Sequence, residues 1–132
     1  MNPELIIAAM LNTAGITTLI GTRKAMSQLP QNTITPALVY TVIDAVPLPH
    51  INYATERQMA RARVQINPLA KTMAEVKSIH DQVRLAMDFK LQQTFAGKTV
   101  ISSRLDLFGT PEKDLDTGTW TQSADYLVSY YE

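Results

Sequence analysis

Few side chains in this sequence have the type and spacing that chemistry requires. The two histidines, His50 and His80, have neither a carboxylate nor a second histidine at ligand spacing, and His80 follows the apolar Ile79. Cysteine is absent, and no phosphate-binding glycine loop, nucleophile elbow or zinc-protease motif occurs. We therefore expect structural or solvated histidines in a protein that is not an enzyme, with no catalytic residues, no metal and no cofactor.

Three carboxylates, Glu112, Asp114 and Asp116, alternate within one polar segment. Hard cations such as calcium bind clustered oxygen atoms, so a metal site is one interpretation of this pattern. However, Lys113 lies among the carboxylates, and the glycine and closing glutamate of an EF-hand loop are missing. The pattern therefore favours a solvated turn.

Arg57, Arg61 and Arg63 form a basic stripe beside and along the polar side of a predicted strand. Such a stripe is most often a solvated face with cross-strand ion pairs, and in other proteins it contacts a phosphate backbone or an acidic partner. Twelve basic residues balance twelve acidic residues in the whole chain. Net charge therefore supplies no attraction to nucleic acid or an anionic membrane, and any contact with DNA must be local.

The composition predicts one folded domain over residues 1–132. A hydrophobic fraction of 45% with 18% charged residues is typical of a globular protein that needs no disulfide or metal. No apolar run approaches the roughly 20 residues that span a bilayer. The N-terminal segment carries Glu4 where a signal peptide would carry basic residues, which indicates a first helix of a cytoplasmic protein.

Two helices have clear signals. Asn2 as N-cap and Pro3 at the first helical position predict a helix that ends within 12–15, and a short turn should follow at 16–20. The apolar face of this first helix should hold Leu5, Ile6, Ala9 and Met10. A capping box of Thr72 and Glu75 opens the main helix. Apolar residues recur there at helical spacing, at Val76, Ile79, Val83 and Ala86 or Met87.

Four strands are predicted, over 37–46, 60–66, 100–108 and 120–131. Almost every position of the first is apolar or β-branched, which indicates burial on both faces or a partner subunit on one face. The second alternates and should end at Pro68. The last alternates as well, and its aromatic residues are expected in the core and at a subunit interface, at Trp120, Tyr126, Tyr130 and Tyr131. Polar loops cover 27–36, 47–56 and 109–118.

Together these elements predict an α+β domain. Its sheet should be mainly antiparallel, with about four or more strands and helices packed on one face.

Several short segments, taken together, resemble one protein family. They are a Leu-Pro pair before a strand that ends in LVY (38–40), RxRVQI (61–66), VRLAM (83–87), GKTV (97–100) and the ending SADYLVSYYE (123–132). In this order the chain resembles the tail completion or tail terminator proteins of tailed bacteriophages over nearly its whole length. One departure is Met73, where the family most often has Tyr or Phe near the start of the helix.

The resemblance implies a virion protein that assembles in the host cytoplasm as a ring, usually six-fold, on the head-proximal end of the tail tube. There such a protein stops tube polymerisation and joins the tail to the head connector or head-completion protein. Genomic DNA passes through its channel without sequence-specific binding, and no membrane is involved. Arg57, Arg61 and Arg63 are then expected to face the channel or an axial partner. Strand-edge pairing or packing of the 37–46 strand is expected to join subunits.

Two alternatives remain open. One is a head-completion or neck adaptor protein that binds the portal side. The other is a small ligand-binding or enzymatic domain of ferredoxin-like type, with the 47–56 segment as a lid over a pocket. That alternative requires convergent polar residues in a concave site, and the sequence offers none.

Overall fold

The computed structural model describes residues 3–29, 34–48 and 59–131. The described helices are α1 (Pro3–Met10), α2 (Ala14–Ile20) and α3 (Met73–Met87). The described strands are β1 (Lys24–Met26), β2 (Ala37–Leu48), β3 (Met59–Ala70), β4 (Lys90–Phe95), β5 (Lys98–Phe108), β6 (Glu112–Asp114), β7 (Thr119–Thr121) and β8 (Ala124–Tyr131).

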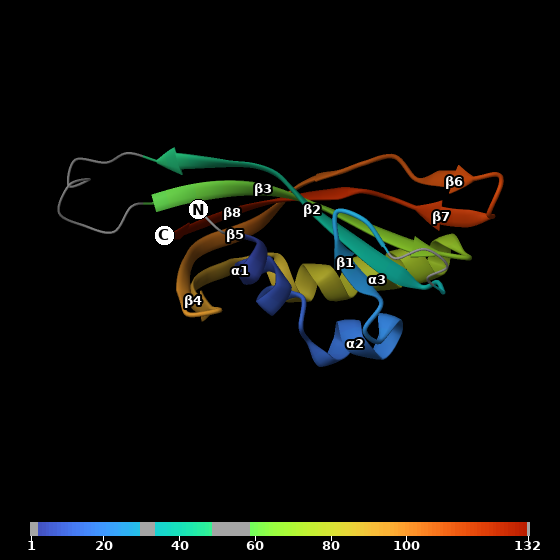
Figure 1. Ribbon diagram of the computed structural model, residues 1–132, viewed down its shortest axis with the longest axis horizontal. Helices are drawn as coiled ribbons and strands as arrows, with labels where there is room; N and C mark the ends of the chain where they lie inside the picture. The colour runs from blue at the N-terminus through green and yellow to red at the C-terminus, as the bar shows by residue number, and fades with distance from the viewer. Residues whose placement is uncertain (1–2, 30–33, 49–58, 132) are drawn as a thin grey trace.

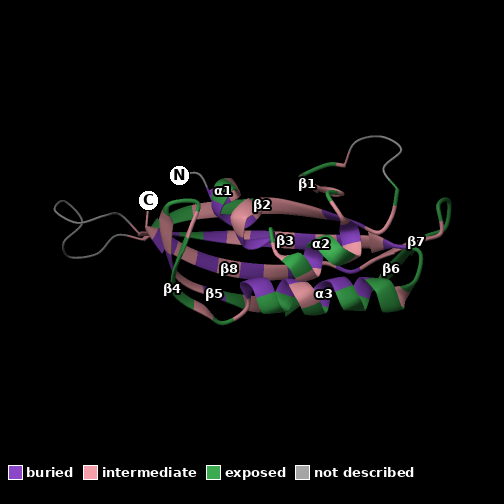
Figure 2. Cartoon of the chain, turned by 90° about the horizontal axis from the view of Figure 1, so that it is seen from below, coloured by how far each residue is buried: buried purple, intermediate pink, exposed green. Residues whose placement is uncertain are grey.

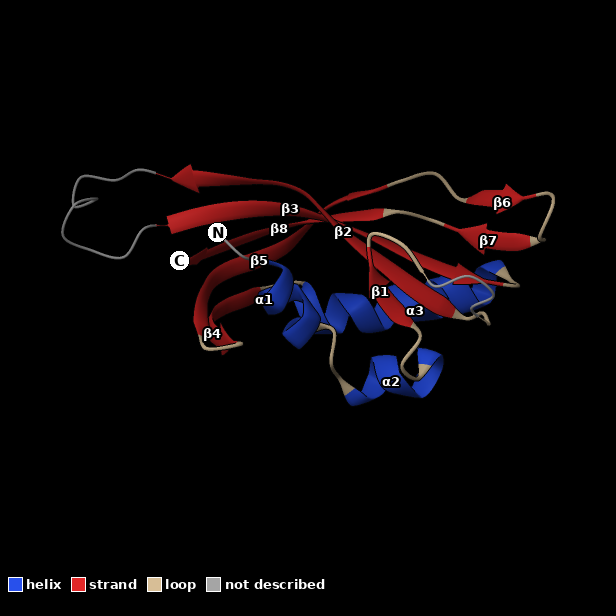
Figure 3. Cartoon of the chain, in the orientation of Figure 1, coloured by secondary structure: helices blue, strands red, loops and turns tan. Residues whose placement is uncertain are grey.

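The strands form one sheet in the order β1-β2-β3-β8-β5-β4, and the β6–β7 hairpin extends from the end of β3. Neighbouring strands are antiparallel, except for the parallel pair β1–β2. All three helices lie on one side of the sheet (Figures 1 and 3). The predicted α+β class, mainly antiparallel sheet and one-sided helix layer are confirmed.

Alternating residues of the central strands β3 and β8 form the floor of the core. Every second side chain points toward the helices and is fully buried, at Ala60, Ala62, Val64 and Ile66 on β3 and at Ala124, Tyr126, Val128 and Tyr130 on β8. The predicted alternation of both strands is confirmed. The final strand is nevertheless interrupted, because residues 122–123 separate β7 from β8.

The prediction that Pro68 ends its strand is wrong, because β3 continues for two residues beyond it. Leu38 lies opposite Pro68, and its N–H donates to Arg23 O on the other side of β2. The Leu38–Pro68 pair is therefore a non-bonded one, and the proline nitrogen faces away from β2. On that side it meets the gap between β7 and β8, so the missing N–H breaks no strand pairing.

Burial of β2 on both faces is also wrong within this chain. Ala37 and Leu38 are fully buried, but Ile43 and Val46 are about half exposed. The short strand β1 pairs only with residues 38–40, so among described residues the remainder of β2 has an open edge. Its apolar composition therefore exceeds what this fold buries, and coverage by a partner subunit stays a prediction.

The first helix differs from its predicted face. Ile6 and Met10 are buried as expected, but Ile7 is buried where Leu5 was expected, and Leu5 is exposed. The N-cap prediction for Asn2 lies outside the described residues, and α2 begins two residues before the predicted turn. No described helix is long and apolar enough to span a membrane alone; α1 and α2 together pass on length and composition but bend by 82°.

The main helix follows its prediction closely. Thr72 is the N-cap of α3, and its side-chain oxygen accepts a hydrogen bond from Glu75 N at 3.3 Å. The expected apolar residues face the sheet, and the opposite face is exposed, as the alternating burial along α3 shows in Figure 2.

Three strands lie where sequence analysis predicted none, and all are short or at an edge. The longest is β4, which is joined to its partner β5 by a two-residue turn at Ala96 and Gly97. Both turn residues have positive φ, 53° and 77°, which is the geometry that matches the twist of a hairpin. β1 and β6 have three residues each, and β6 lies within the predicted 109–118 loop.

His80 is a core residue with 2% relative exposure, whereas His50 lies outside the described residues. The Nε2–H of His80 donates to Gln122 O at 2.7 Å. The His80 ring meets the Phe108 ring edge-on, with 5.2 Å between ring centroids. The buried Nδ1 has no hydrogen-bond partner among described atoms. Burial is the main cause that lowers the pKa of His80, and the bond to Gln122 opposes it, so the neutral ring is favoured.

This pKa shift predicts a pH-dependent stability. The unfolded chain binds a proton near pH 6.5, whereas folded His80 resists protonation, so the free energy of unfolding should fall as the pH is lowered below that value. Urea unfolding at about pH 7.5 and about pH 5.5 measures this loss. His80→Gln retains an N–H donor without titrating and should show a smaller loss. An equal loss in the variant would contradict the assignment.

Candidate assembly surface

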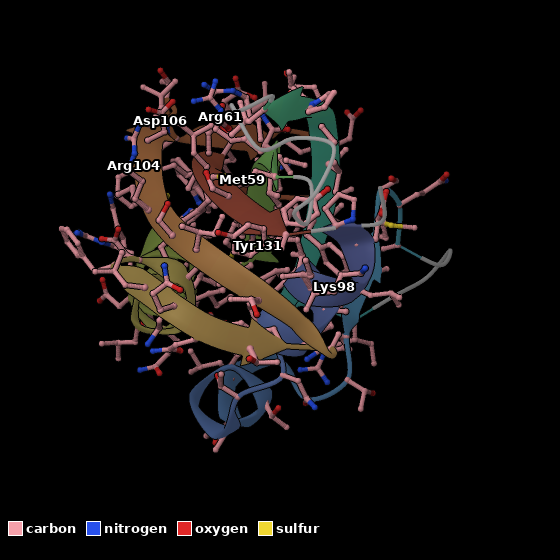
Figure 4. All side chains as sticks on the ribbon, turned by 90° about the vertical axis from the view of Figure 1, so that its left-hand side faces the viewer. Met59, Arg61, Lys98, Arg104, Asp106 and Tyr131 are labelled. Atoms are coloured by element: carbon pink, nitrogen blue, oxygen red, sulfur yellow. The ribbon has the colours of Figure 1, made fainter. Side chains whose placement is uncertain are left out.

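The side of the sheet away from the helices, here called the outer face, collects the polar positions of the central strands. Successive side chains of a strand alternate, so the odd-numbered residues of β3 and β8 lie on this face. Figure 4 views the end of the sheet where β3 begins and β8 ends, with Arg61, Arg104 and Asp106 grouped on the outer side. Met59 and Tyr131 lie between them and Lys98 in this view.

Arg63 is held by two carboxylates from neighbouring strands. Its Nη1 lies 2.8 Å from Asp106 Oδ2 on β5 and 3.2 Å from Asp125 Oδ2 on β8. Arg104 Nη1 contacts the other oxygen of Asp106 at 3.4 Å. The hydrogen bond to Asp106 is the main cause that raises the pKa of Arg63, and Asp125 adds to it. Arg63 therefore follows the cross-strand ion-pair interpretation, and its charge is largely compensated.

Arg61 is in a different situation from Arg63. It is exposed and forms no ion pair with any described residue. In register it lies between Val46 on β2 and Ser129 on β8. Arg57 lies outside the described residues. Of the three predicted arginines, Arg61 is thus the one whose charge the described outer face leaves available to a partner.

The acidic segment forms an exposed hairpin. Glu112, Asp114 and Asp116 are all exposed, and Asp114 Oδ1 accepts a hydrogen bond from Asp116 N at 2.9 Å. Lys113 Nζ lies 5.7 Å from the centre of the Trp120 ring. In the part of the chain that the structure describes, no three His, Cys, Asp or Glu side chains gather into a potential metal site. The segment is therefore an exposed hairpin whose turn is held by local hydrogen bonds.

The predicted interface aromatics divide into two groups. Tyr126 and Tyr130 are fully buried under the helices, so they belong to the core. Burial raises the pKa of the Tyr126 hydroxyl, which therefore stays protonated at physiological pH. Trp120 and Tyr131 are partly exposed, Trp120 on strand β7 of the hairpin and Tyr131 at the end of the sheet.

Two surface hollows test the ligand-binding alternative. One lies between α2 and α3 and is mainly apolar, with Leu19, Pro36, Ala74, Glu75, Ser78 and Ile79 in its lining. The other lies on the outer face, with Gln65, Asn67, Thr110, Glu112, Thr121, Gln122 and Ser123 in its lining. Each contains a single carboxylate and no histidine, lysine or arginine, so neither offers a paired acid and base.

Sequence analysis found the arginines but missed the acidic partners of Arg63. Asp106 and Asp125 occupy polar positions of the alternating segments 100–108 and 120–131, and this position is the only signal that the sequence offers for them. Their 43- and 62-residue separations from Arg63 are bridged only by the strand order β3-β8-β5.

The chain is similar in sequence to one protein family and in fold to two solved structures. A family model described as tail completion protein gp17 matches residues 4–118. A solved structure of the virion of a native gene transfer agent particle contains a chain with a TM-score of 0.74 and 10% identity, over 98% of this chain and 96% of that one. A second solved protein, whose name states no function, has a TM-score of 0.60 and 15% identity, over 100% and 96% of the two chains. No curated protein sequence matches.

At these identities the two solved structures support the fold alone, whereas the family model covers most of the sequence. It also agrees with the resemblance carried by the short segments at 38–40, 61–66, 83–87 and 97–100. Because the match runs from residue 4 to residue 118 of 132, the chain belongs to the tail completion protein gp17 family and is a structural protein of the phage tail, a component of the virion.

Proposed function

We propose that this protein forms a ring on the head-proximal end of a phage tail tube, ends tube polymerisation and provides the surface to which the head is joined. The observation that carries the proposal is the family match over residues 4–118. Its partners are then further copies of itself, the tail tube protein and the head connector or head-completion protein. Genomic DNA passes through the ring without sequence-specific contacts.

The surface of the subunit supports a role in assembly. Two hollows that lack paired charges leave little for catalysis, whereas the outer face is broad and polar and has no helix over it (Figure 1). The hairpin β6–β7 extends beyond the sheet and suits contact with an axial neighbour. Rings need heterologous contacts between two different surfaces of the same subunit, and an open sheet provides two different edges.

The basic stripe of three arginines contributes charge to the channel or to an axial contact of the proposed ring. Arg57, Arg61 and Arg63 face the channel or an axial partner, and Arg61 contributes the most because Arg63 is compensated by Asp106 and Asp125. At position 61 each subunit then adds one cation that has no ion pair with a described residue, and a ring of such single charges allows DNA to pass without binding it tightly.

A head-side neck adaptor remains the second candidate, since it would use the same fold and differ only in its partner. Binding to purified portal complex and to tail tube, compared in one experiment, separates the two roles.

Tube capping tests the proposal directly. Increasing amounts of the purified protein, mixed with polymerising tail-tube subunits, should shorten the tubes and place a ring at one end, because a bound ring blocks further addition. Negative-stain electron microscopy measures tube length and the capped fraction against a sample without the protein. Uncapped tubes of unchanged length, together with binding to the portal, would move the protein to the head side.

Arg61→Glu and Arg63→Glu form a matched pair of charge reversals. Arg61→Glu should leave the melting temperature unchanged, because Arg61 has no described ion pair, but should reduce assembly or DNA passage. Arg63→Glu should lower the melting temperature, because it places a third carboxylate beside Asp106 and Asp125. Circular dichroism and the yield of infectious particles measure the two effects. Normal infectivity with Arg61→Glu would refute the role of that side chain.

A further inference from the structure

The two lateral edges of the sheet each present exposed apolar side chains around one charge. On one edge, the β2 patch consists of Ile43, Asp44 and Val46, and its apolar residues are 50% and 46% exposed. On the other, the β4 patch consists of Phe89, Lys90 and Leu91, with 81% exposure for Phe89 and 65% for Leu91. Three strands, β3, β8 and β5, lie between the two patches.

Strand register places the two patches at the same height of the sheet. Val46 lies opposite Arg61, Arg61 opposite Ser129, Ser129 opposite Ser102, and Ser102 opposite Leu91. One cross-strand row therefore begins at an exposed valine and ends at an exposed leucine. Rotation about an axis parallel to the strands moves a subunit without shifting its height, so a ring of this kind brings the two ends of such a row together.

The charges of the two patches are complementary. Asp44 is exposed and lies opposite Arg63, but that guanidinium binds Asp106 and Asp125, and Asp44 has no ion pair with a described residue. Lys90 likewise has no ion pair with any described residue. Each edge thus offers one charge of opposite sign. Asp44 lies on the outer side of β2, whereas Lys90 lies opposite the buried Ser103, on the helix side of β4, so the long lysine side chain must reach around the edge to meet an acid of the next copy.

Local backbone features favour side-chain contact over simple strand addition at these edges. The β2–β3 register shifts between Val42 and Asp44, and β4 contains Gln92 with φ of 51°. Such irregularities discourage direct pairing of edge strands. Phe89 also has positive φ, 56°, an uncommon conformation for an aromatic residue, and it holds the ring away from the core. An aromatic side chain held in this way suits an anchor in an interface.

We propose that the β2 patch of one copy docks against the β4 patch of the next copy, and that this contact repeats around the ring. The inference rests on the proposed ring function and names the subunit contact within it. The contact joins two different surfaces, so an open chain of subunits has one free patch at each end. Only a closed ring covers both patches of every subunit. The contact uses only the two ends of this cross-strand row and leaves the middle of the outer face, with Arg61, free to face the channel.

A cysteine pair tests the contact in the assembled state. The chain has no native cysteine, so Val46→Cys combined with Leu91→Cys introduces two unique thiols. Within one copy they are four inter-strand spacings of about 4.8 Å apart, which is too far for a disulfide. Mild oxidation of capped tubes should therefore produce covalent oligomers up to the ring size. Val46→Cys with Leu115→Cys, which uses the exposed hairpin tip, should give none.

Charge reversal provides the second test. Asp44→Lys alone and Lys90→Asp alone should each reduce the capped fraction severalfold, because each places like charges across the contact. The double variant restores opposite charges at every contact and should recover capping. Asp81→Lys, an equal charge change on the exposed side of α3, is the matched control and should cap normally.

The outcomes separate this contact from the proposed function. If the unmodified protein does not cap tubes, the ring function itself fails. If it caps tubes but the 46–91 cysteine pair gives no intersubunit crosslink, or the double reversal fails to recover capping although both variants fold, the ring uses another contact and this inference is overturned. Crosslinks confined to the 46–91 pair, with recovery in the double variant, support it.

Discussion

The fold depends on the two-residue alternation of β3 and β8, whose inward side chains must be buried together. Opposite residues complement each other in size, with Ala60 facing Tyr130 and Val64 facing Tyr126. The small alanine leaves room for the large ring, and α1 and α3 close over both. A slip of one residue would move every tyrosine of this row to the wet face and every outer polar residue into the core, so burial specifies the register strongly.

The same alternation determines the character of the outer face. Residues that cannot be buried are placed beside one another, and Arg63, Asp106 and Asp125 satisfy each other there. Exposed pairs of this kind contribute little to stability, but they set which charges remain for partners. The function of a tail completion protein is then a property of surfaces, as expected for a chain in which the two hollows described above hold no paired acid and base.

Strand order makes the edges of the sheet the least complete part of the subunit. β1 covers only three residues of β2, and β4 covers only the first half of β5. Asp88 Oδ1 accepts the N–H of Leu105 at 2.8 Å, which caps part of the remaining β5 edge. The exposed apolar residues of β2 and β4 have no such local cover among described residues, and in the proposed ring a neighbouring subunit covers them.

By itself the sequence determined the faces of β3, β8 and α3, the cap at Thr72 and the α+β class, because periodicity and capping are properties of neighbouring residues. The short strands β1 and β6 and the irregular β4 could not be predicted, since they form through pairing and carry little signal of their own. Burial of β2 was overestimated because composition does not say how many neighbours a strand has. Only the tertiary structure decided that Arg63 meets Asp106 and Asp125 while no described residue forms an ion pair with Arg61. Ion pairs across strands depend on strand order and register, and these are set by burial of the whole sheet.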